Sequence, residues 1–282
     1  MAGSIDESNI ALRDIETAAD LKAVEALQRE VWGCSDLDVT PLTMLQASRE
    51  VGATLIGAYD GESLVGFVYG FPGYEHDRPI HHSHMLAVKP AYRHHRLGFK
   101  LKLAQREKVL AQHVDRITWT FDPLQSLNAH LNFAKLGVIA DTYKVDFYGA
   151  ATSSFLHQIG TDRLWVTWLI DSQRVRERLR GVTNNGESAC LPESTRALVQ
   201  VINGNKPKRN EAAGEFGNKT LSIEIPWDIN ALQRQQPQLA VKWREATRWA
   251  FNHAFASSYV VTDFCAKKID HSIGVYLLNS RD

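Results

Sequence analysis

The sequence predicts an α/β protein with a mixed central sheet, followed by a smaller α/β extension. Short apolar runs with strand-like alternation recur between longer segments whose apolar residues repeat about every three to four positions. The clearest case lies at 82–112, where a strand, a basic loop and a long helix pattern follow one another directly. Further strand runs and another helix pattern occur beyond residue 172. Alternating strands and helices are typical of the α/β class.

Composition narrows the class of protein. The 282 residues are 44% hydrophobic, which is enough for one large domain or two small ones. Lys plus Arg and Asp plus Glu each number 32, so the chain has no general attraction for nucleic acid or anionic membranes. Three scattered cysteines make neither a disulfide framework nor a paired metal spacing and fit a reducing compartment. Without a signal-peptide pattern or a membrane-spanning apolar run, a cytoplasmic protein is expected.

Capping and turn residues mark the elements before residue 90. Thr17 lies three residues before Asp20, an N-cap arrangement, and the helix it begins is expected to end near Gly33. Pro41 is typical of the start of a second helix. Residues 60–63 separate two β-type runs and predict a hairpin turn. The other expected elements are a disordered start (1–8), strands at 10–15, 53–59 and 64–71, a loop at 72–79 and a fourth strand at 81–88.

The stretch 82–112 carries the strongest functional signal. Its apolar strand ends before a basic loop that contains Arg93, Arg96 and Gly98, and a long helix pattern begins at about Leu97. The first amides of a helix are unpaired and its N-terminus carries a partial positive charge, so this loop is suited to bind phosphate oxygens. On the local pattern alone, a solvated surface turn is an equal alternative.

The segments after this loop complete one sheet and begin a second region. The helix from Leu97 is expected to place its polar residues outward, Lys100, Lys102 and Gln105 among them. A short helix is expected to end at Gly137. The expected strands are 115–121, 138–148 and 164–170, and beyond them come strands 197–202, 221–225 and 259–264, a helix at 238–256 and loops at 181–193 and 203–218. The later strand, helix and strand suggest a degenerate, catalytically silent repeat of residues 84–121.

The order of these parts resembles the coenzyme A core of the Gcn5-related N-acetyltransferase (GNAT) superfamily. The family's loop has the form Arg/Gln-x-x-Gly-x-Gly/Ala. Here Arg93 and Gly98 stand at its first and last positions, while Arg96 replaces the middle glycine. The runs WTFDPLQ, NAHLNFAKLG and DRLWVTWLI resemble, more narrowly, a subgroup of uncharacterised bacterial predicted acetyltransferases. Some relatives of that subgroup are associated with N-acylation of amino acids, including succinylation.

The resemblance implies a GNAT acyltransferase domain over residues 9–171 and a C-terminal α/β extension over residues 172–282. In that fold the fourth and fifth strands splay apart and admit the pantetheine arm, while the diphosphate lies at the helix start. Acetyl-CoA or another acyl-CoA is then the co-substrate, without a metal. The implied coenzyme-binding residues are Met85, Leu86, Ala87, Val88, Arg93, His94, His95, Arg96, Leu97, Gly98, Phe99, Lys100, Asn128 and Asn132. For the last two, which should share a helix face, capping and surface exposure are the alternative.

Several residues are candidates for accepting a proton. His82 and His84 share one face of the fourth strand because side chains alternate along it. As a zinc pair they lack a third ligand in the sequence. His84 lies nearest the splayed region and is the preferred base, and Asp122 and Glu75 compete with it.

The position of the general acid departs from the family's pattern. The family's tyrosine, which protonates the departing thiolate, aligns with Phe133, and phenylalanine has no proton to give. We expect Tyr143 or Tyr148 to take its part, or the thiolate to leave unaided.

The function implied is an acyl-CoA-dependent N-acyltransferase, acetyl or succinyl, that acts on the amine of a small molecule such as an amino acid. Direct transfer in a ternary complex is expected, because no cysteine occupies a convincing nucleophile position. The alternatives are a non-catalytic acyl-CoA-binding protein and a protein or peptide N-acetyltransferase. The expected partner is the small-molecule amine, with no nucleic acid and no membrane, and a homodimer is left open.

Overall fold

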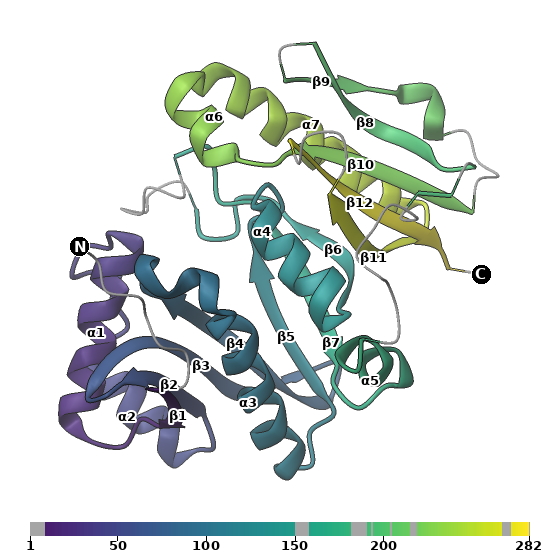
Figure 1. The fold of residues 1–282 in the computed structure, drawn as a ribbon. Helices are drawn as coiled ribbons and strands as arrows, with labels where there is room; N and C mark the ends of the chain where they lie inside the picture. Colours follow the sequence, from purple (N-terminus) through teal and green to yellow (C-terminus); the bar gives the residue numbers. More distant parts are fainter. Residues whose placement is uncertain are drawn as a thin grey trace. The chain divides into compact units, whose positions relative to one another are not determined.

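The structure is a computed structural model that describes residues 9–149, 158–181, 191–192, 194–203, 205–214, 219–266 and 272–281. The expected disordered start at 1–8 lies outside these residues. The described chain forms two compact units, one as far as Trp119 and the other from Thr120 onward (Figure 1). This division falls inside the predicted acyltransferase domain, whose boundary at residue 171 stays a prediction.

The first unit contains an antiparallel run of strands that ends in one parallel pair. β1 to β4 are successive antiparallel neighbours, and β4 pairs in parallel with β5 (Figure 1). Only the last two residues of β5 belong to the second unit. The bounds are β1 (Ile10–Asp14), β2 (Thr54–Asp60), β3 (Ser63–Glu75), β4 (Arg78–Val88) and β5 (Arg116–Phe121).

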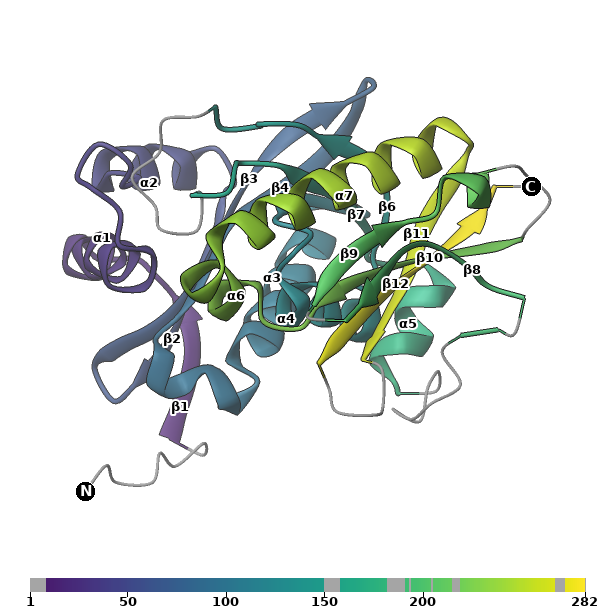
Figure 2. The same cartoon turned by 90° about the horizontal axis from the view of Figure 1, so that it is seen from above.

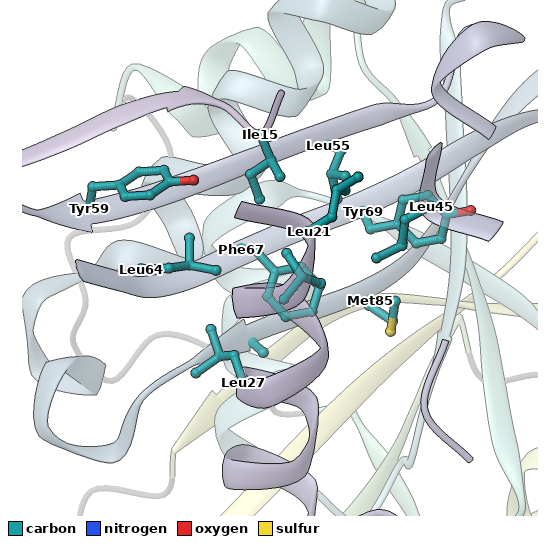
Figure 3. Packing of buried hydrophobic residues seen from close by; sticks show 12 residues of the cluster. Ile15, Leu21, Leu27, Leu45, Leu55, Tyr59, Leu64, Phe67, Tyr69 and Met85 are labelled. Atoms are coloured by element: carbon teal, nitrogen blue, oxygen red, sulfur yellow. The ribbon is translucent and has the colours of Figure 1, made fainter. Parts of the chain in front are cut away.

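Helices cover both faces of these strands. α1 (Ala18–Trp32) and α2 (Leu42–Glu50) contribute to one apolar cluster, which contains Leu21, Leu45, Phe67 and Met85 (Figure 3). α3 (Leu97–Ala111) packs on the opposite face against a second cluster that includes Ile56 and Val68. Each of these follows a residue of the first cluster along its strand, and side chains alternate between the two faces. Burying large apolar side chains on both faces, at about 1.5–3 kcal/mol each, stabilises this sheet.

Two predicted helix starts in this unit are confirmed. Thr17 caps α1 by accepting from Asp20 N at 3.1 Å, and the Asp20 carboxylate accepts from Thr17 N in return. Gly33 ends this helix in the left-handed conformation, with φ 65°. Pro41 directly precedes α2. These caps satisfy backbone groups that the helix itself leaves unpaired.

The expected loop at 72–79 is wrong, because β3 and β4 continue through it as a long hairpin. Their pairing extends to Glu75 and Arg78, and the turn between them consists of His76 (φ 48°) and Asp77 (φ 61°). Two successive residues with positive φ make the type of turn that matches the twist of antiparallel strands. Prolines at 72 and 79 suggested a loop, but proline is tolerated where a strand edge needs no amide donor.

β4 carries a bulge at His84. Tyr69 of β3 pairs with Met85 and Gly70 pairs with Ser83, so His84 is an extra residue on β4. Met85 belongs to the α1 and α2 cluster, and Leu86 packs with the α3 cluster on the other face. A bulge of this kind bends the strand and places two consecutive side chains on one face.

The second unit is a sheet with the strand order β7-β6-β11-β12-β10-β8-β9. The long helix α7 packs across β6, β8, β9, β10 and β11, and it runs along these strands in Figure 2. Two strands of this sheet were not predicted. β9 lies in the expected loop at 203–218, and β12 follows the last predicted strand. The strand bounds are β6 (Ile139–Lys144), β7 (Arg163–Leu169), β8 (Arg196–Ile202), β9 (Lys206–Arg209), β10 (Thr220–Pro226), β11 (Tyr259–Ala266) and β12 (Ile273–Ser280).

The helices of the second unit are short apart from α7. α4 continues directly into the π-helix η3, whose turns are wider than those of an α-helix. The bounds are α4 (Ser126–Ala129), η3 (His130–Leu136), α5 (Gln173–Leu179), the 3-10 helix η5 (Glu211–Gly214), α6 (Ile229–Gln235) and α7 (Pro237–Ala256).

The suspected repeat is present in connectivity but not in strand pairing. β10 and β11 both run antiparallel to β12, so they are parallel to one another and joined through α7. β12 lies between them, whereas β4 and β5 pair directly. The expected likeness to residues 84–121 therefore does not extend to the opening between two adjacent strands.

The two cysteines that the structure describes differ in their bonding. Cys34 is free and Cys265 is disulfide-bonded, a bond that the scattered spacing did not predict. Spacing along the chain does not report distance in space. In the part of the chain that the structure describes, no helix combines the length and the apolar character needed to cross a membrane.

Candidate active site

The parallel pairing of β4 with β5 is short. In the described residues it joins only His81 with Ile117 and His82 with Thr118, although β4 stays paired with β3 as far as Val88. The backbone groups of residues 83–88 on the side toward β5 therefore have no β5 partner. An amide-bearing ligand can supply one, because exposed ladder groups need hydrogen-bond partners. This is the predicted divergence of the two strands.

The basic loop leads into a helix end that no side chain caps. It forms the 3-10 helix η2 (Pro90–His95), and α3 begins at Leu97, as predicted. Arg96 is the N-cap residue and its side chain makes no capping bond. The first main-chain bond runs from Lys100 N to Arg96 O at 3.0 Å. The amides of residues 97–99 are therefore available to an anion.

Arg96 has the left-handed conformation that glycine favours. Its φ is 55°, at the position where the resemblance expects the family's middle glycine. The arginine is exposed and its guanidinium lies 5.3 Å from the Phe99 ring centroid. Arg93 is exposed too, and its Nε donates to Val88 O at 3.4 Å. Open amides beside two exposed cations fit the diphosphate of coenzyme A.

The other predicted phosphate-binding residues are placed as follows. Gly98 is the second residue of α3 and not part of the loop before it. His95 and Lys100 are half-buried, and the His95 ring lies 6.5 Å from that of Tyr92. The side chain of His94 lies outside what the structure describes. The coenzyme contacts of these residues stay predictions.

His82 and His84 form a ring cluster on β4 with two aromatic residues of β3. The Phe71 ring centroid lies 5.6 Å from that of His82 and 5.7 Å from that of His84, and Tyr69 lies 6.2 Å from His84. His82 Nδ1 lies 3.1 Å from Thr118 Oγ1. His84 is the exposed member of the cluster and is also the bulged residue. The predicted shared face of the two histidines is confirmed.

These surroundings favour neutral imidazoles. Burial, with the charges of His84 and Lys102, lowers the pKa of His82 to about 4. Burial also lowers the pKa of His84. Both rings are then unprotonated at neutral pH and able to accept a proton.

Lys102 was expected on the outer face of α3 and is instead buried, with 2% of its surface exposed. Its Nζ donates to Ser83 Oγ at 2.7 Å and lies 3.6 Å from the Trp119 ring centroid. Burial lowers its pKa well below the usual value. The expectation was wrong because long stems on a helix flank can reach inward, which the apolar period does not reveal.

A chain of buried polar groups continues from this lysine. Gln105 was expected outward as well, but it is fully buried and its Nε2 donates to Thr54 Oγ1 at 2.9 Å. Thr54 Oγ1 lies 2.9 Å from His81 Nε2, while His81 Nδ1 has no hydrogen-bond partner among the described residues. A Cβ at Gly70 would lie 2.6 Å from His81 Nε2, so only glycine fits beside this chain.

Asp122, the competing base, is held in a buried ion pair. Arg244 donates to both of its carboxylate oxygens, at 2.8 and 2.7 Å, and Leu124 N donates to Oδ1 at 2.9 Å. Both carboxylate oxygens are thereby committed to a buried guanidinium and are not free to meet an acceptor amine. The geometry therefore argues against Asp122 as the general base. Glu75 is also paired, with Arg116 at 3.2 Å.

Tyr143 is likewise committed to internal partners. Its hydroxyl donates to Asp162 Oδ2 at 2.7 Å, and its ring stacks on Phe251 at 5.5 Å. Burial raises the pKa of this phenol. A general acid must reach the leaving thiolate, and this hydroxyl points to a buried carboxylate instead. Tyr148 is exposed, and its hydroxyl lies 3.5 Å from Thr120 Oγ1.

The expected common face of Asn128 and Asn132 is not present. Asn128 is exposed, whereas Asn132 is 3% exposed. The chain changes from α-helix to π-helix between them, so a spacing of four no longer returns to the same side. Phe133 is fully buried and its ring lies 5.7 Å from that of Tyr276.

A family comparison agrees with this arrangement. The model of the acetyltransferase (GNAT) family matches residues 21–138. This segment is a GNAT acetyltransferase domain. The predicted family is thereby confirmed for this segment, and with it the predicted enzyme class and acyl-CoA co-substrate of a GNAT acetyltransferase domain. The α3 start, Arg93, Arg96 and the open edge of β4 all lie within the GNAT domain.

Structural comparisons give weaker similarities. The chain is similar to a GNAT-family protein from Desulfovibrio desulfuricans, with 14% identity and a TM-score of 0.47 over 57% of this chain and 99% of that one. It is also similar to aminoglycoside 6′-acetyltransferase type Ii, with 18% identity and a TM-score of 0.46 over 58% of this chain and 98% of that one. A third similar structure is a GNAT-family acetyltransferase from Elizabethkingia anophelis with acetyl-CoA bound, with 14% identity and a TM-score of 0.41 over 57% of this chain and 98% of that one. No curated protein sequence matches significantly.

Sequence reasoning missed two buried cations, Lys102 and Arg244. Arg244 stands within the apolar stripe of α7, beside Trp243 and one turn before Thr247, both fully buried. A charged residue on an otherwise apolar helix face was the available signal, because such a residue needs a buried partner.

Proposed function

We propose that this GNAT protein transfers an acetyl or succinyl group from acyl-CoA to the amine of a small molecule such as an amino acid. The observation that carries the proposal is the uncapped start of α3 beside the open edge of β4, both inside the GNAT domain. The small-molecule acceptor rests on the narrower resemblance of the three sequence runs. The acyl chain, the acceptor and the mechanism are thus parts of the proposal.

The first task of the protein is to bind and orient the coenzyme. The amides of residues 97–99 receive the diphosphate, and Arg93 and Arg96 neutralise its charge. The free backbone groups of residues 83–88 pair with the amides of the pantetheine arm. The bound acyl-CoA supplies a thioester, and the bond to its sulfur breaks as the amine attacks. Amide donors of β4 stabilise the negative charge that develops on the carbonyl oxygen.

The second task is to free the acceptor amine of its proton. His84 is the proposed base, because it is exposed on the bulge of β4 and its lowered pKa leaves it neutral at pH 7. Asp122 and Tyr143 are not included, since both are bonded to buried partners. Direct transfer in a ternary complex then needs only that both reactants are held in line.

Coenzyme release tests the reaction and the acceptor together. Purified protein is mixed with acetyl-CoA or succinyl-CoA, and the free thiol is measured in the presence of single amino acids or of short peptides. We expect turnover with an amino acid for at least one of the two donors. Turnover on peptides alone would replace the small-molecule acceptor by the peptide alternative. Coenzyme binding without any thiol release would support the non-catalytic alternative.

Substitutions test the proposed residues. Arg93→Ala with Arg96→Ala should weaken acetyl-CoA binding by roughly tenfold or more, because two charge-assisted contacts are lost. Lys22→Ala, an exposed lysine of α1, is the matched control and should bind normally. His84→Ala should lower kcat roughly 10²-fold at neutral pH while coenzyme affinity is kept. Unchanged coenzyme affinity in the double variant would contradict the phosphate site.

A further inference from the structure

The segment that follows β5 is held by residues from far along the chain. Tyr276 donates its hydroxyl to Pro123 O at 2.6 Å, and Ser126 Oγ donates to Pro226 O at 3.0 Å. The side-chain amides of residues 125 and 230 bond one another in both directions, each at 3.1 Å. With the pair between Asp122 and Arg244, these contacts fasten the segment 122–133 at several points.

The contacts are buried and specific. Asp122 is 7% exposed, Ser126 2% and Arg244 3%. Arg244 forms two short bonds to one carboxylate, and its Nε also donates to Ile159 O at 3.3 Å. A planar guanidinium fixes a carboxylate in direction as well as in distance, which a lysine does not. Asp122 in turn accepts from Leu124 N, so the pair sets the turn that starts α4.

The family match and these contacts divide the chain differently. The GNAT domain ends at residue 138, and it contains the whole segment 122–133. The partners that hold this segment lie at residues 226, 230, 244 and 276, beyond the end of the match. The segment includes Asn128, a predicted coenzyme contact, and Phe133, the position aligned with the family's tyrosine. The residues that hold the last segment of the GNAT domain therefore lie outside that domain.

We propose that the C-terminal region is a positioning scaffold for acyl transfer, with Arg244 the positioning residue that acts through Asp122. The scaffold sets the direction in which the chain leaves β5 and enters α4, and an error of about 1 Å in such a segment costs up to roughly 10²-fold in rate. This inference rests on the proposed acyl transfer for its kinetic consequence only.

A variant cycle in the full-length protein tests the scaffold. Arg244→Met, Asp122→Asn and the double variant should each lower kcat by roughly 10- to 100-fold. The double variant should be no slower than the single variants, because all three break the same ion pair. The KM for acyl-CoA should change less than kcat does, since most of the predicted coenzyme contacts lie in the other unit. Arg244→Lys keeps the charge and should restore part of the rate. Additive losses, or a kcat within twofold of wild type, would overturn the proposal.

A second readout does not depend on activity. Amide hydrogen exchange at Leu124, whose N–H bonds Asp122, should accelerate at least roughly tenfold in Arg244→Met under conditions where the protein stays folded. Val199→Ala is the control, because it opens a cavity at a fully buried residue of β8 and lowers stability without touching the segment. Its kcat and its exchange at Leu124 should stay near wild type. If exchange at Leu124 in Arg244→Met equals that of wild type, the scaffold is overturned. If exchange accelerates in Arg244→Met but the wild-type protein shows no turnover, only the proposed function is contradicted.

Discussion

Two buried cations, one in each unit, show how differently the same problem is solved. Lys102 of α3 and Arg244 of α7 are 2% and 3% exposed. The lysine contacts a hydroxyl, an amide oxygen and the face of Trp119, and burial lowers its pKa well below the usual value. For the arginine, burial alone would lower the pKa, but the Asp122 carboxylate outweighs it and the pKa is raised.

The difference teaches that the partner, more than the burial, decides whether a buried group keeps its charge. A carboxylate at 2.7 Å stabilises the cation, while neutral partners do not compensate the lost hydration. Arg244 is therefore a charged structural fastening. Lys102 is a group whose charged form is disfavoured, next to the strand that carries the proposed base.

The largest effect should follow from breaking the Arg244 pair. Arg244→Met leaves the Asp122 carboxylate buried without its cation, which typically costs about 3–5 kcal/mol of unfolding free energy. Chemical denaturation measures this cost. Arg176→Met is the control, because it removes an exposed pair with Asp171 and should cost less than about 1 kcal/mol. Equal effects of the two variants would mean that the Asp122 pair is not buried in solution.

The histidine side of the first unit should respond to mild acid. Burial, with the charges of Lys102 and His82, lowers the pKa of His81 to about 4, against about 6.5 in the unfolded chain. Between these values the unfolded state binds more protons, so unfolding free energy should fall as pH falls from 6.5 to 4. The loss attributable to His81 is up to about 3 kcal/mol. His81→Asn should show a shallower slope over this window, and an unchanged slope would contradict the shift.

Lys102→Met should change stability little at neutral pH, by less than about 1 kcal/mol, since an amine whose charged form is disfavoured by burial is replaced by an apolar chain of similar length. The sharper measurement is the alkaline slope. Because the folded pKa is lowered, wild-type unfolding free energy should rise with pH as far as about 10.4, where the unfolded lysine loses its proton. The methionine variant should lack this rise. A large loss of stability at neutral pH would show that Lys102 is charged and well paired.

The smallest effect concerns a third cation, Arg96, which is exposed. Arg96→Gly should raise unfolding free energy by up to about 1 kcal/mol, because glycine adopts its φ of 55° without strain. Coenzyme affinity should nevertheless fall, since the charge is lost. Arg96→Ala separates the two contributions, because it removes the charge and keeps the strain. Destabilisation by glycine would show that the arginine side chain supports the loop.

Local signals predicted the first unit well where they act over a few residues. The capping box of Thr17 and Asp20, the end of α1 at Gly33 and the start of α3 at Leu97 follow from backbone groups that must find nearby partners. Such rules need no knowledge of the rest of the chain. They were less useful for the hairpin beyond Phe71, where register with a neighbouring strand overrode the prolines.

The amino-acid sequence by itself determined the order of strand, basic loop and helix, and with it the GNAT family and its acyl-CoA co-substrate. Only the tertiary structure decided that Lys102 points inward, that Asp122 is paired with Arg244, and that β4 carries its bulge at His84. The physical reason is range. Helix ends are satisfied within one turn of chain, whereas a buried charge takes whatever partner folding brings to it, here one that lies 122 residues away.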